Sequence, residues 1–344
     1  MEDALRTIYA GLMILSGAAS VSGNLLLLLA LLLNKSLRND ATGLTLSSSL
    51  SDLALGLSTI PFGAYNSITQ HSCYPSEGVV CQGSGFIFLL LLTSSLHSLT
   101  WTTVNKFTEI CFALSYSSIW TARRSRAVLV LVWGFCLVTA SLPLLGFGRY
   151  VYSESRFLCC LSFDPDDKPF VLLWTLVGIV APLLAMCSLY AYIVYVARKQ
   201  ARRGTFMCNE LHCYYVPANN YLRSSLVMVT TSVCLLVCWL PFTSVCLYET
   251  LSGHQSPAGT ASLSAWLVLT SAALNPWITC VTQTKYRAAL HRSLRWFAAT
   301  CPRSSAHGES RPQSAARLDA TNTIRTTATA ATQLSSPPKT QTAP

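Results

Sequence analysis

The chain has 344 residues, of which 51% are hydrophobic and only 11% are charged. A soluble domain carries about 25% charged residues, so an ordinary soluble enzyme is disfavoured. Lysine and arginine outnumber aspartate and glutamate by 24 to 14, which gives a net charge of +10. Two classes remain: a nucleic-acid-binding protein, or a membrane protein with its positive charges sorted to one side.

Seven apolar stretches are each long enough to cross a hydrocarbon core of about 30 Å, which takes about 20 helical residues. They predict an all-α membrane protein with a seven-transmembrane helix bundle over residues 8–281, preceded by a short extracellular N-terminus, residues 1–7. No small-residue cleavage site is followed by a polar domain, so we expect the first span to stay in the mature chain. The predicted spans are Ile8–Leu33, Leu44–Tyr65, Gly83–Thr103, Ala127–Phe147, Phe170–Val196, Leu226–Leu247 and Ala261–Val281.

The basic residues lie mostly on one side of these spans. Of the 24, 20 fall on one side, and four (Arg6, Arg149, Arg156 and Lys168) fall on the other. This bias predicts an extracellular N-terminus and a cytoplasmic C-terminus at the plasma membrane. Because the basic residues are spread over every loop of one side, we expect no nucleic-acid partner. The charge instead favours contact with anionic lipid of the inner leaflet.

The segment after the last span predicts a short amphipathic helix, residues 282–301, that lies in the headgroup region. Its apolar face carries Tyr286, Leu290, Leu294 and Phe297. Cys301 lies where palmitoylation would add a second anchor, and an ordinary reduced thiol is the alternative. Residues 302–344 are rich in Ser, Thr, Ala and Pro without apolar periodicity, which predicts a disordered cytoplasmic tail.

Four cysteines fall on the outer, oxidising side: Cys73, Cys81, Cys159 and Cys160. The neighbours Cys159 and Cys160 are not expected to pair with each other, so two bridges would tie Cys73 and Cys81 to them. For Cys81 we favour Cys160 as the partner, with Cys159 as the alternative. Either pairing would hold the second outer loop over the helix bundle.

Short motifs follow one another in a fixed order along the spans. They are Gly23-Asn24 in the first, Leu50-Ser51-Asp52-Leu53-Ala54 in the second, Trp133 and Pro143 in the fourth, Pro182 and Tyr190 in the fifth, Cys238-Trp239-Leu240-Pro241 in the sixth and Asn275-Pro276 in the seventh. With the bridging cysteine Cys81, this series resembles that of the rhodopsin-like (class A) G-protein-coupled receptors. The resemblance implies a receptor that signals to a heterotrimeric G protein or an arrestin. No HExxH or GxSxG motif is present, and we expect no enzyme.

Two motifs depart from the family's pattern. Where the family has Asp-Arg-Tyr, this chain has Asn105-Lys106-Phe107, which removes a carboxylate and replaces a planar guanidinium with a flexible ammonium. Where the family's Asn-Pro-x-x-Tyr element has tyrosine, this chain has Thr279, so Tyr190 is expected to lose its partner. Loss of the carboxylate that pairs with the cation lowers the cost of opening and favours basal activity, whereas lost active-state contacts weaken coupling. Each effect is worth ~1–3 kcal/mol.

We therefore expect an orphan-type receptor with weak or atypical coupling. The alternative is a non-signalling relative that acts as a partner or trafficking subunit in a hetero-oligomer with another receptor. A transporter would show internal repeats with paired broken helices, and the sequence has no such repeats.

Asp52 is the one acidic residue deep within a predicted span, where a carboxylate costs ~2.5–3.5 kcal/mol. The resemblance implies that Asp52, Ser95, Ser271 and Asn275 line a sodium pocket, whose oxygen ligands suit a hard cation. A protonated or water-bonded structural acid is the alternative. No other cofactor is expected, and the seventh span has no lysine that could hold retinal.

Phe88 stands seven residues after Cys81, where amine receptors carry the acid that binds the ligand's ammonium group. Monoamines bound in the usual way are therefore disfavoured. The resemblance implies a ligand pocket formed by Phe88, Leu92, Trp174, Trp239, Phe242, Thr243 and Leu269. This surface suits a lipid-like or neutral apolar ligand. The alternatives are that these side chains fill the space themselves, or that a basic peptide touches the acidic outer loops.

Overall fold

The structure is a computed structural model that describes residues 2–69, 74, 78–203, 205–209, 212–216, 218–282, 286–292 and 295. The chain divides into two units, Met1–Thr300 and Cys301–Pro344. The predictions for Cys73, for Cys301 and for residues 302–344 lie outside the described residues.

The first unit is built from long helices. They are α1 (Glu2–Leu33), α2 (Thr42–Leu57), α3 (Thr59–Thr69), α4 (Val79–Cys111), α6 (Ala122–Ser141), α8 (Ala181–Arg203), α9 (Ala218–Ser252) and α10 (Ala258–Thr282). Short helices link them: η1 (Lys35–Leu37), η2 (Ala113–Ser115), α5 (Tyr116–Ile119), η3 (Leu142–Leu145), η4 (Pro165–Asp167) and α7 (Lys168–Leu173). A π-helical segment, η5 (Trp174–Val180), joins α7 to α8. Within the described residues, six helical stretches are long and apolar enough to cross a membrane.

The second predicted span is two helices because the chain breaks between α2 and α3. Pro61 has no amide hydrogen, so it cannot donate to the carbonyl of Leu57, the last residue of α2. Ser58, between the two helices, donates its hydroxyl to Ala54 O at 2.6 Å. Each half is too short to cross a membrane alone, but together they cover the predicted stretch.

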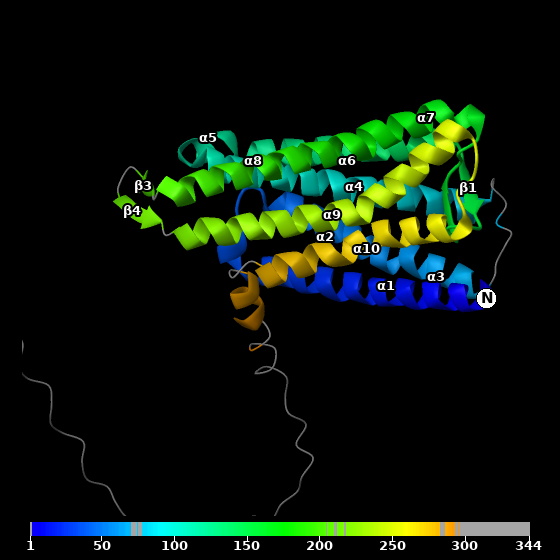
Figure 1. Cartoon of the computed structure of the whole chain (residues 1–344), viewed down its shortest axis with the longest axis horizontal. Helices are drawn as coiled ribbons and strands as arrows, with labels where there is room; N and C mark the ends of the chain where they lie inside the picture. Colours follow the sequence, from blue (N-terminus) through cyan, green and yellow to red (C-terminus); the bar gives the residue numbers. More distant parts are fainter. Residues whose placement is uncertain are drawn as a thin grey trace, which may run out of the picture. The chain divides into compact units, whose positions relative to one another are not determined.

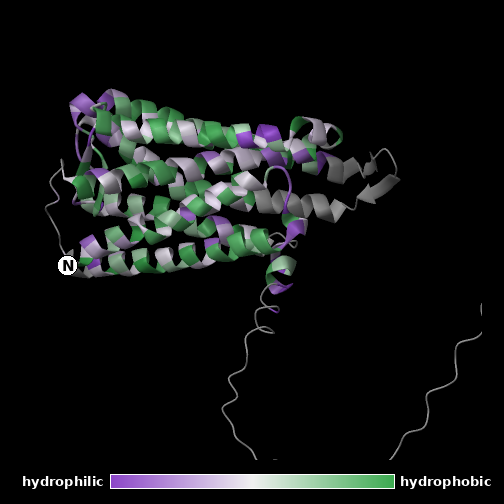
Figure 2. Ribbon diagram, turned by 180° about the vertical axis from the view of Figure 1, so that it is seen from behind, coloured by the Kyte–Doolittle hydropathy of each residue, from purple (hydrophilic) through white to green (hydrophobic). Residues whose placement is uncertain are grey.

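The helices form a closed bundle. α1 packs against α2, α3 and α10, α4 against α2, α6 and α8, and α9 against both α8 and α10. Figure 1 shows the start of α1 and strand β1 at one end of the bundle, here named the outer end, with α5, β3 and β4 at the opposite, inner end. Hydrophobic residues extend along the helices, and hydrophilic ones gather toward their ends (Figure 2).

Serine hydroxyls join the interior of α2 to its neighbours. Ser47 and Ser98 bond through their hydroxyls at 2.9 Å, and Trp133 Nε1 of α6 donates to the same Ser47 oxygen at 2.9 Å. Ser51 and Ser94 bond in the same way at 2.7 Å. Buried polar groups cost free energy unless they are paired, so these contacts fix how α2, α4 and α6 face one another.

Two antiparallel hairpins lie at the ends of the bundle. At the outer end, β1 (Tyr150–Ser153) pairs with β2 (Leu158–Leu161). At the inner end, β3 (Thr205–Asn209) pairs with β4 (His212–Val216). After α10, residues 286–292 are helical, with Tyr286 and Leu290 half-buried.

Candidate functional site

The centre of the bundle holds a polar cluster around Asp52, which is almost fully buried on α2. Its Oδ1 accepts a hydrogen bond from Ser95 Oγ of α4 at 2.5 Å, and its Oδ2 accepts one from Asn275 Nδ2 of α10 at 3.1 Å. The Ser271 hydroxyl donates to Val268 O within α10 at 2.6 Å. Three of the four residues predicted to form a sodium pocket therefore contact one another, and Ser271 lies in the same helix as Asn275.

The Gly23-Asn24 motif joins α1 to this cluster. A Cβ on Gly23 would lie 2.8 Å from Pro276 Cγ and 2.8 Å from Trp277 Nε1, so only glycine permits the approach of α10. Asn24 Nδ2 donates to Ala272 O at 3.0 Å, and Trp277 Nε1 donates to Ala19 O at 3.0 Å. The backbone of α10 is thereby held against α1 on both sides of Asn275.

A cavity of about 80 Å³ extends from the Asp52 cluster toward the inner end. Asp52 and Asn275 line one part of it, and Lys106, Tyr190 and Thr279 line another. A space of this volume is large enough for several water molecules. The candidate sodium-pocket residues and three of the candidate transducer-coupling residues therefore share one internal space.

The Asn105-Lys106-Phe107 triplet lies in the last two turns of α4, at this inner end. Asn105 Nδ2 donates to the Tyr116 hydroxyl of α5 at 2.9 Å, and the Phe107 ring packs edge-on against Tyr192 of α8, 5.7 Å between ring centroids. Within the described side chains, Lys106 forms no hydrogen bond and no ion pair. The Asn105 amide and the Phe107 ring thus hold the triplet in place, and the Lys106 ammonium group lines the cavity.

The Tyr190 hydroxyl of α8 bonds to α4. Its partner is Thr103 Oγ1 at 2.9 Å, and both residues are buried. Thr103 lies two residues before the triplet, so this bond ties α8 to the inner part of α4. Thr279 lines the cavity with Tyr190 but does not replace this bond.

The predicted ligand-pocket residues form a packed cluster toward the outer end. All seven are buried: Phe88, Leu92, Trp174, Trp239, Phe242, Thr243 and Leu269. The space against Phe88, Trp174 and Phe242 has a volume of only about 10 Å³, smaller than the ~300–1,000 Å³ typical of a small-molecule pocket. The seven side chains therefore pack closely against one another at this level of the bundle.

The outer hairpin covers this cluster and is anchored by a disulfide between Cys81 and Cys159. The favoured pairing of Cys81 with Cys160 is wrong. Successive residues of a strand point to opposite faces, so when Cys159 points to α4, Cys160 points away from it. Cys160 is a free, buried thiol whose pKa is raised by that burial.

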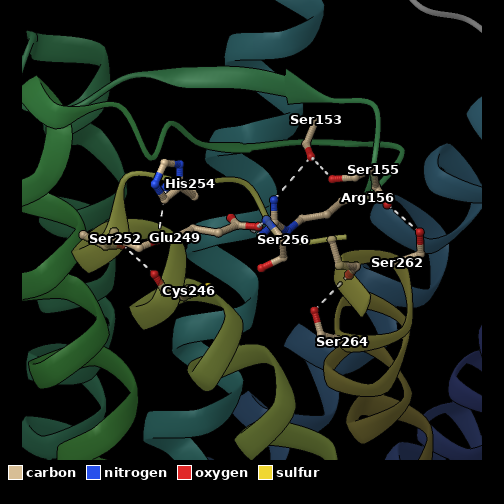
Figure 3. Close-up of polar contacts among 12 residues, drawn as sticks. Ser153, Ser155, Arg156, Cys246, Glu249, Ser252, His254, Ser256, Ser262 and Ser264 are labelled. Atoms are coloured by element: carbon tan, nitrogen blue, oxygen red, sulfur yellow. Dashed lines mark hydrogen bonds and ion pairs between the residues drawn. The ribbon is translucent and has the colours of Figure 1, made fainter. Parts of the chain in front are cut away.

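An ion pair between Arg156 and Glu249 closes the outer end over the cluster (Figure 3). Arg156 lies in the turn between β1 and β2, Glu249 lies near the end of α9, and their Nη2 and Oε2 atoms are 2.6 Å apart. The side chains are only 5% and 4% exposed. The guanidinium also lies over the Phe163 ring, 4.9 Å from its centroid. We name this pair the outer latch.

Three further hydrogen bonds tie the latch to α1 and α10. The Tyr9 hydroxyl of α1 donates to Arg156 O at 3.3 Å. The Ser256 amide, just before α10, donates to Glu249 Oε1 at 3.1 Å. Ser262 Oγ of α10 donates to the carbonyl oxygen of Ser155, the neighbour of Arg156 in the turn, at 2.5 Å. The latch thus joins the outer loop to three helices.

The profile of a known family matches most of the bundle. Residues 23–278 fit the family described as "7 transmembrane receptor (rhodopsin family)". The chain belongs to this family. Family membership and the apolar helices make the protein a multi-pass plasma-membrane receptor that couples to G proteins and is not an enzyme.

The receptor's relatives include proteins named for two different ligands, histamine and adenosine. The human histamine H2 receptor is 27% identical over 78% of this chain and 74% of its own length. The guinea-pig (Cavia porcellus) histamine H2 receptor is 26% identical over 79% and 75%. The human adenosine receptor A2b is 25% identical over 85% of this chain and 90% of its own length.

Sequence reasoning missed the outer latch of this receptor. Arg156 and Glu249 are 93 positions apart, and both read as ordinary loop charges on the outer side. One signal was available, because Glu249 is the only acidic residue within α9. A charged side chain at the end of a membrane helix is costly unless it is paired. Nothing in the sequence, however, singles out Arg156 among the four outer basic residues.

Proposed function

We propose that this receptor couples weakly to its G protein and does so with part of its activity independent of ligand. The observation that carries the proposal is the inner end of α4. Lys106 stands where the family has arginine, forms no ion pair within the described side chains, and faces the cavity with Tyr190 and Thr279.

The two effects of this arrangement act in opposite directions. Asn105 is a neutral amide bonded to Tyr116, so the carboxylate that pairs with the cation in the family is missing at position 105, which lowers the cost of opening. A lysine offers a transducer one point charge in place of a five-donor fork, which weakens the bound state. Each effect is worth about 1–3 kcal/mol, so basal signalling is present and its maximum is low.

The test replaces Asn105-Lys106-Phe107 by Asp-Arg-Tyr and measures G-protein activation and arrestin recruitment at equal surface expression. We expect coupling to rise about tenfold, the equivalent of roughly 1.4 kcal/mol. Arg123→Lys, an exposed substitution at the inner end of α6, is the matched control and should change nothing. Unchanged coupling in the triple variant would contradict the proposal. Silence of both proteins in every channel would favour the partner-subunit function instead.

The central cluster is not a site for a cationic amine. Histamine carries a positive charge at neutral pH, yet Phe88 occupies the position of the amine-binding acid. Within the described residues the buried carboxylates are Asp52, Asp167 and Glu249, and Glu249 is already paired with Arg156. We therefore expect no response to histamine, although histamine H2 receptors are among the relatives.

We also propose that a sodium ion binds at Asp52. The Asp52 carboxylate and the Ser95 hydroxyl supply oxygen ligands of the kind a hard cation takes. The Ser271 hydroxyl keeps its acceptor lone pairs while it donates to Val268. Asn24 Oδ1, which lines the same cavity, is buried without a partner among the described residues. The donor set therefore fits one monovalent cation, and the ion would neutralise the buried carboxylate.

Thermal unfolding in sodium chloride and in choline chloride tests the sodium site. We expect sodium to raise the midpoint of the wild-type protein and to have no effect on Asp52→Ala, because a ligand stabilises only the state that binds it. Ser67→Ala, which removes a buried hydroxyl that bonds within α3, is the control and should keep the sodium response. Equal responses of wild type and Asp52→Ala would refute the site.

The orientation of the chain is also a proposal, supported by the excess of basic residues at the inner end. An epitope tag before α1 should be stained in intact cells, and a tag after residue 344 only in permeabilised cells. Staining of the C-terminal tag in intact cells would overturn the orientation.

A further inference from the structure

A second cavity, of about 460 Å³, lies at the outer end between α1, the β1–β2 turn and the start of α10. Its volume falls within the range of ~300–1,000 Å³ typical of ligand pockets, whereas the central cluster leaves only about 10 Å³. We name it the α1–α10 cavity. It does not overlap the central cluster, because no residue of that cluster lines it.

One wall of the cavity is apolar and reaches the surface of the bundle. Leu12 of α1 and Leu263 and Trp266 of α10 form this wall. Leu263 is 52% exposed and Ile8, also at the cavity, is 59% exposed. In a membrane-spanning bundle exposed apolar side chains face lipid, so this wall of the cavity adjoins the lipid-facing surface of the bundle.

The rim of the cavity carries one cation and one anion. Arg6 and Glu154 both line it, and within the described residues neither forms an ion pair or a hydrogen bond. A site with two unpaired opposite charges is electrically neutral overall but complementary to a ligand that carries both charges. A guanidinium recognises phosphate, and a carboxylate attracts a quaternary ammonium group.

Three aromatic side chains complete the polar end. Tyr9 and Phe157 pack with ring centroids 5.2 Å apart and line the cavity together with Trp266. The Trp266 indole nitrogen is already satisfied, because it donates to Ser16 Oγ at 3.0 Å, so the residue offers its ring surface to a ligand. Aromatic rings beside a carboxylate form the usual environment for a choline-type cation.

We propose that the α1–α10 cavity binds a single-chain phospholipid with a phosphocholine headgroup, taken from the outer leaflet. The phosphate contacts Arg6, the choline group lies among the three rings beside Glu154, and the acyl chain follows Leu12 and Leu263 to the bilayer. This assignment is independent of how strongly the receptor couples to a G protein.

The cavity wall is bonded directly to the outer latch. Ser262 donates to Ser155 O (Figure 3). Tyr9 donates to Arg156 O, and the Ser256 amide donates to Glu249. A ligand in the cavity therefore contacts residues that hold α9 to the outer loop. Lipid binding and closure of the outer latch are therefore coupled. Because such coupling is reciprocal, the factor by which a bound lipid favours the closed latch equals the factor by which a closed latch raises the affinity for the lipid.

The experiment is native mass spectrometry of the full chain in a maltoside detergent with added lysophosphatidylcholine. We expect one bound lipid, retained at least tenfold more tightly than a chain-matched monoacylglycerol or lysophosphatidylglycerol. Gly259→Phe should abolish retention, because Gly259 lines the cavity and a Cβ there meets open space. Gly11→Phe, on an equally open but exposed face of α1 outside the cavity, is the matched control.

Charge variants test the headgroup assignment. Glu154→Gln should shift the preference at least tenfold toward lysophosphatidylglycerol, and Arg6→Gln should shift it toward an alkyltrimethylammonium of the same chain length. The double exchange Arg6→Glu with Glu154→Arg should abolish the preference for phosphocholine, because it places a carboxylate at the phosphate and a guanidinium at the choline group. Equal retention of all headgroups, or headgroup preferences unchanged by these variants, overturns the zwitterion assignment. Unchanged retention in Gly259→Phe overturns the site.

Discussion

Neutralising Glu249 gives the sharpest test of the outer latch. Glu249→Gln keeps the shape of the side chain and removes its charge, which leaves the Arg156 guanidinium buried without a counter-ion. Arg156 Nε already lacks a partner among the described residues, and the side chain is only 5% exposed. The guanidinium cannot reach water without displacing the hairpin that covers the central cluster.

Removing one partner of a buried ion pair costs about 3–5 kcal/mol. Replacing both charges by apolar side chains of similar volume is often neutral, because no charge is left to desolvate. We therefore expect Glu249→Gln to lower the free energy of unfolding by about 3–5 kcal/mol, and Arg156→Met with Glu249→Met to recover most of that loss.

Tryptophan fluorescence during denaturant unfolding in micelles measures these differences, since the chain has eight tryptophans. Asp164→Asn is the matched control: Asp164 pairs with Arg149 at 3.0 Å in the same loop, but the two side chains are 63% and 55% exposed. Exposed ion pairs contribute little, so this variant should unfold like the wild type. If Glu249→Gln behaved like Asp164→Asn, the latch would be solvated and our account of it would be wrong.

Two other predictions concern the cover over the central cluster and use the same unfolding measurement. Cys159→Ser opens a loop of 78 positions and should lower the free energy of unfolding by about 2–5 kcal/mol. Cys160→Ser should keep the disulfide, so reduction should shift its unfolding midpoint as much as it shifts that of the wild type. A lost bridge in Cys160→Ser would contradict the pairing. Gly85→Ala would set a Cβ 2.6 Å from the Tyr150 ring and should destabilise by about 1–3 kcal/mol, while Gly83→Ala, with open space around it, should stabilise by up to about 1 kcal/mol. The same sign for both glycines would refute the close approach.

The bundle follows from the sequence because each span is a local property. About 20 apolar residues define a membrane helix without reference to any other part of the chain. Asp52 itself could be singled out because a carboxylate within an apolar run is costly, whereas its partners Ser95 and Asn275 came from the resemblance to the family. The break at Ser58 was also predictable, because Pro61 has no amide hydrogen to donate to the carbonyl of Leu57.

The pairings could not be predicted, because they depend on three-dimensional register. Whether Cys159 or Cys160 faces Cys81 depends on the phase of a strand, and a shift of one residue reverses it. Glu249 pairs with Arg156, and Tyr190 bonds to Thr103, because of the positions that the outer loop and the helices take along the axis of the bundle. That the central cluster is filled depends on how side chains from several helices pack together, and no motif records such packing.

The bond between Asn275 and Asp52 also sets an order of events during synthesis. The two residues are 223 positions apart, so at about 5–20 residues per second Asn275 leaves the ribosome roughly 10–45 seconds after Asp52. Ser95, only 43 positions downstream, arrives much sooner. Until the seventh span is complete, the Asp52 carboxylate therefore has the Ser95 hydroxyl of the third span, and not the Asn275 amide, as its native partner.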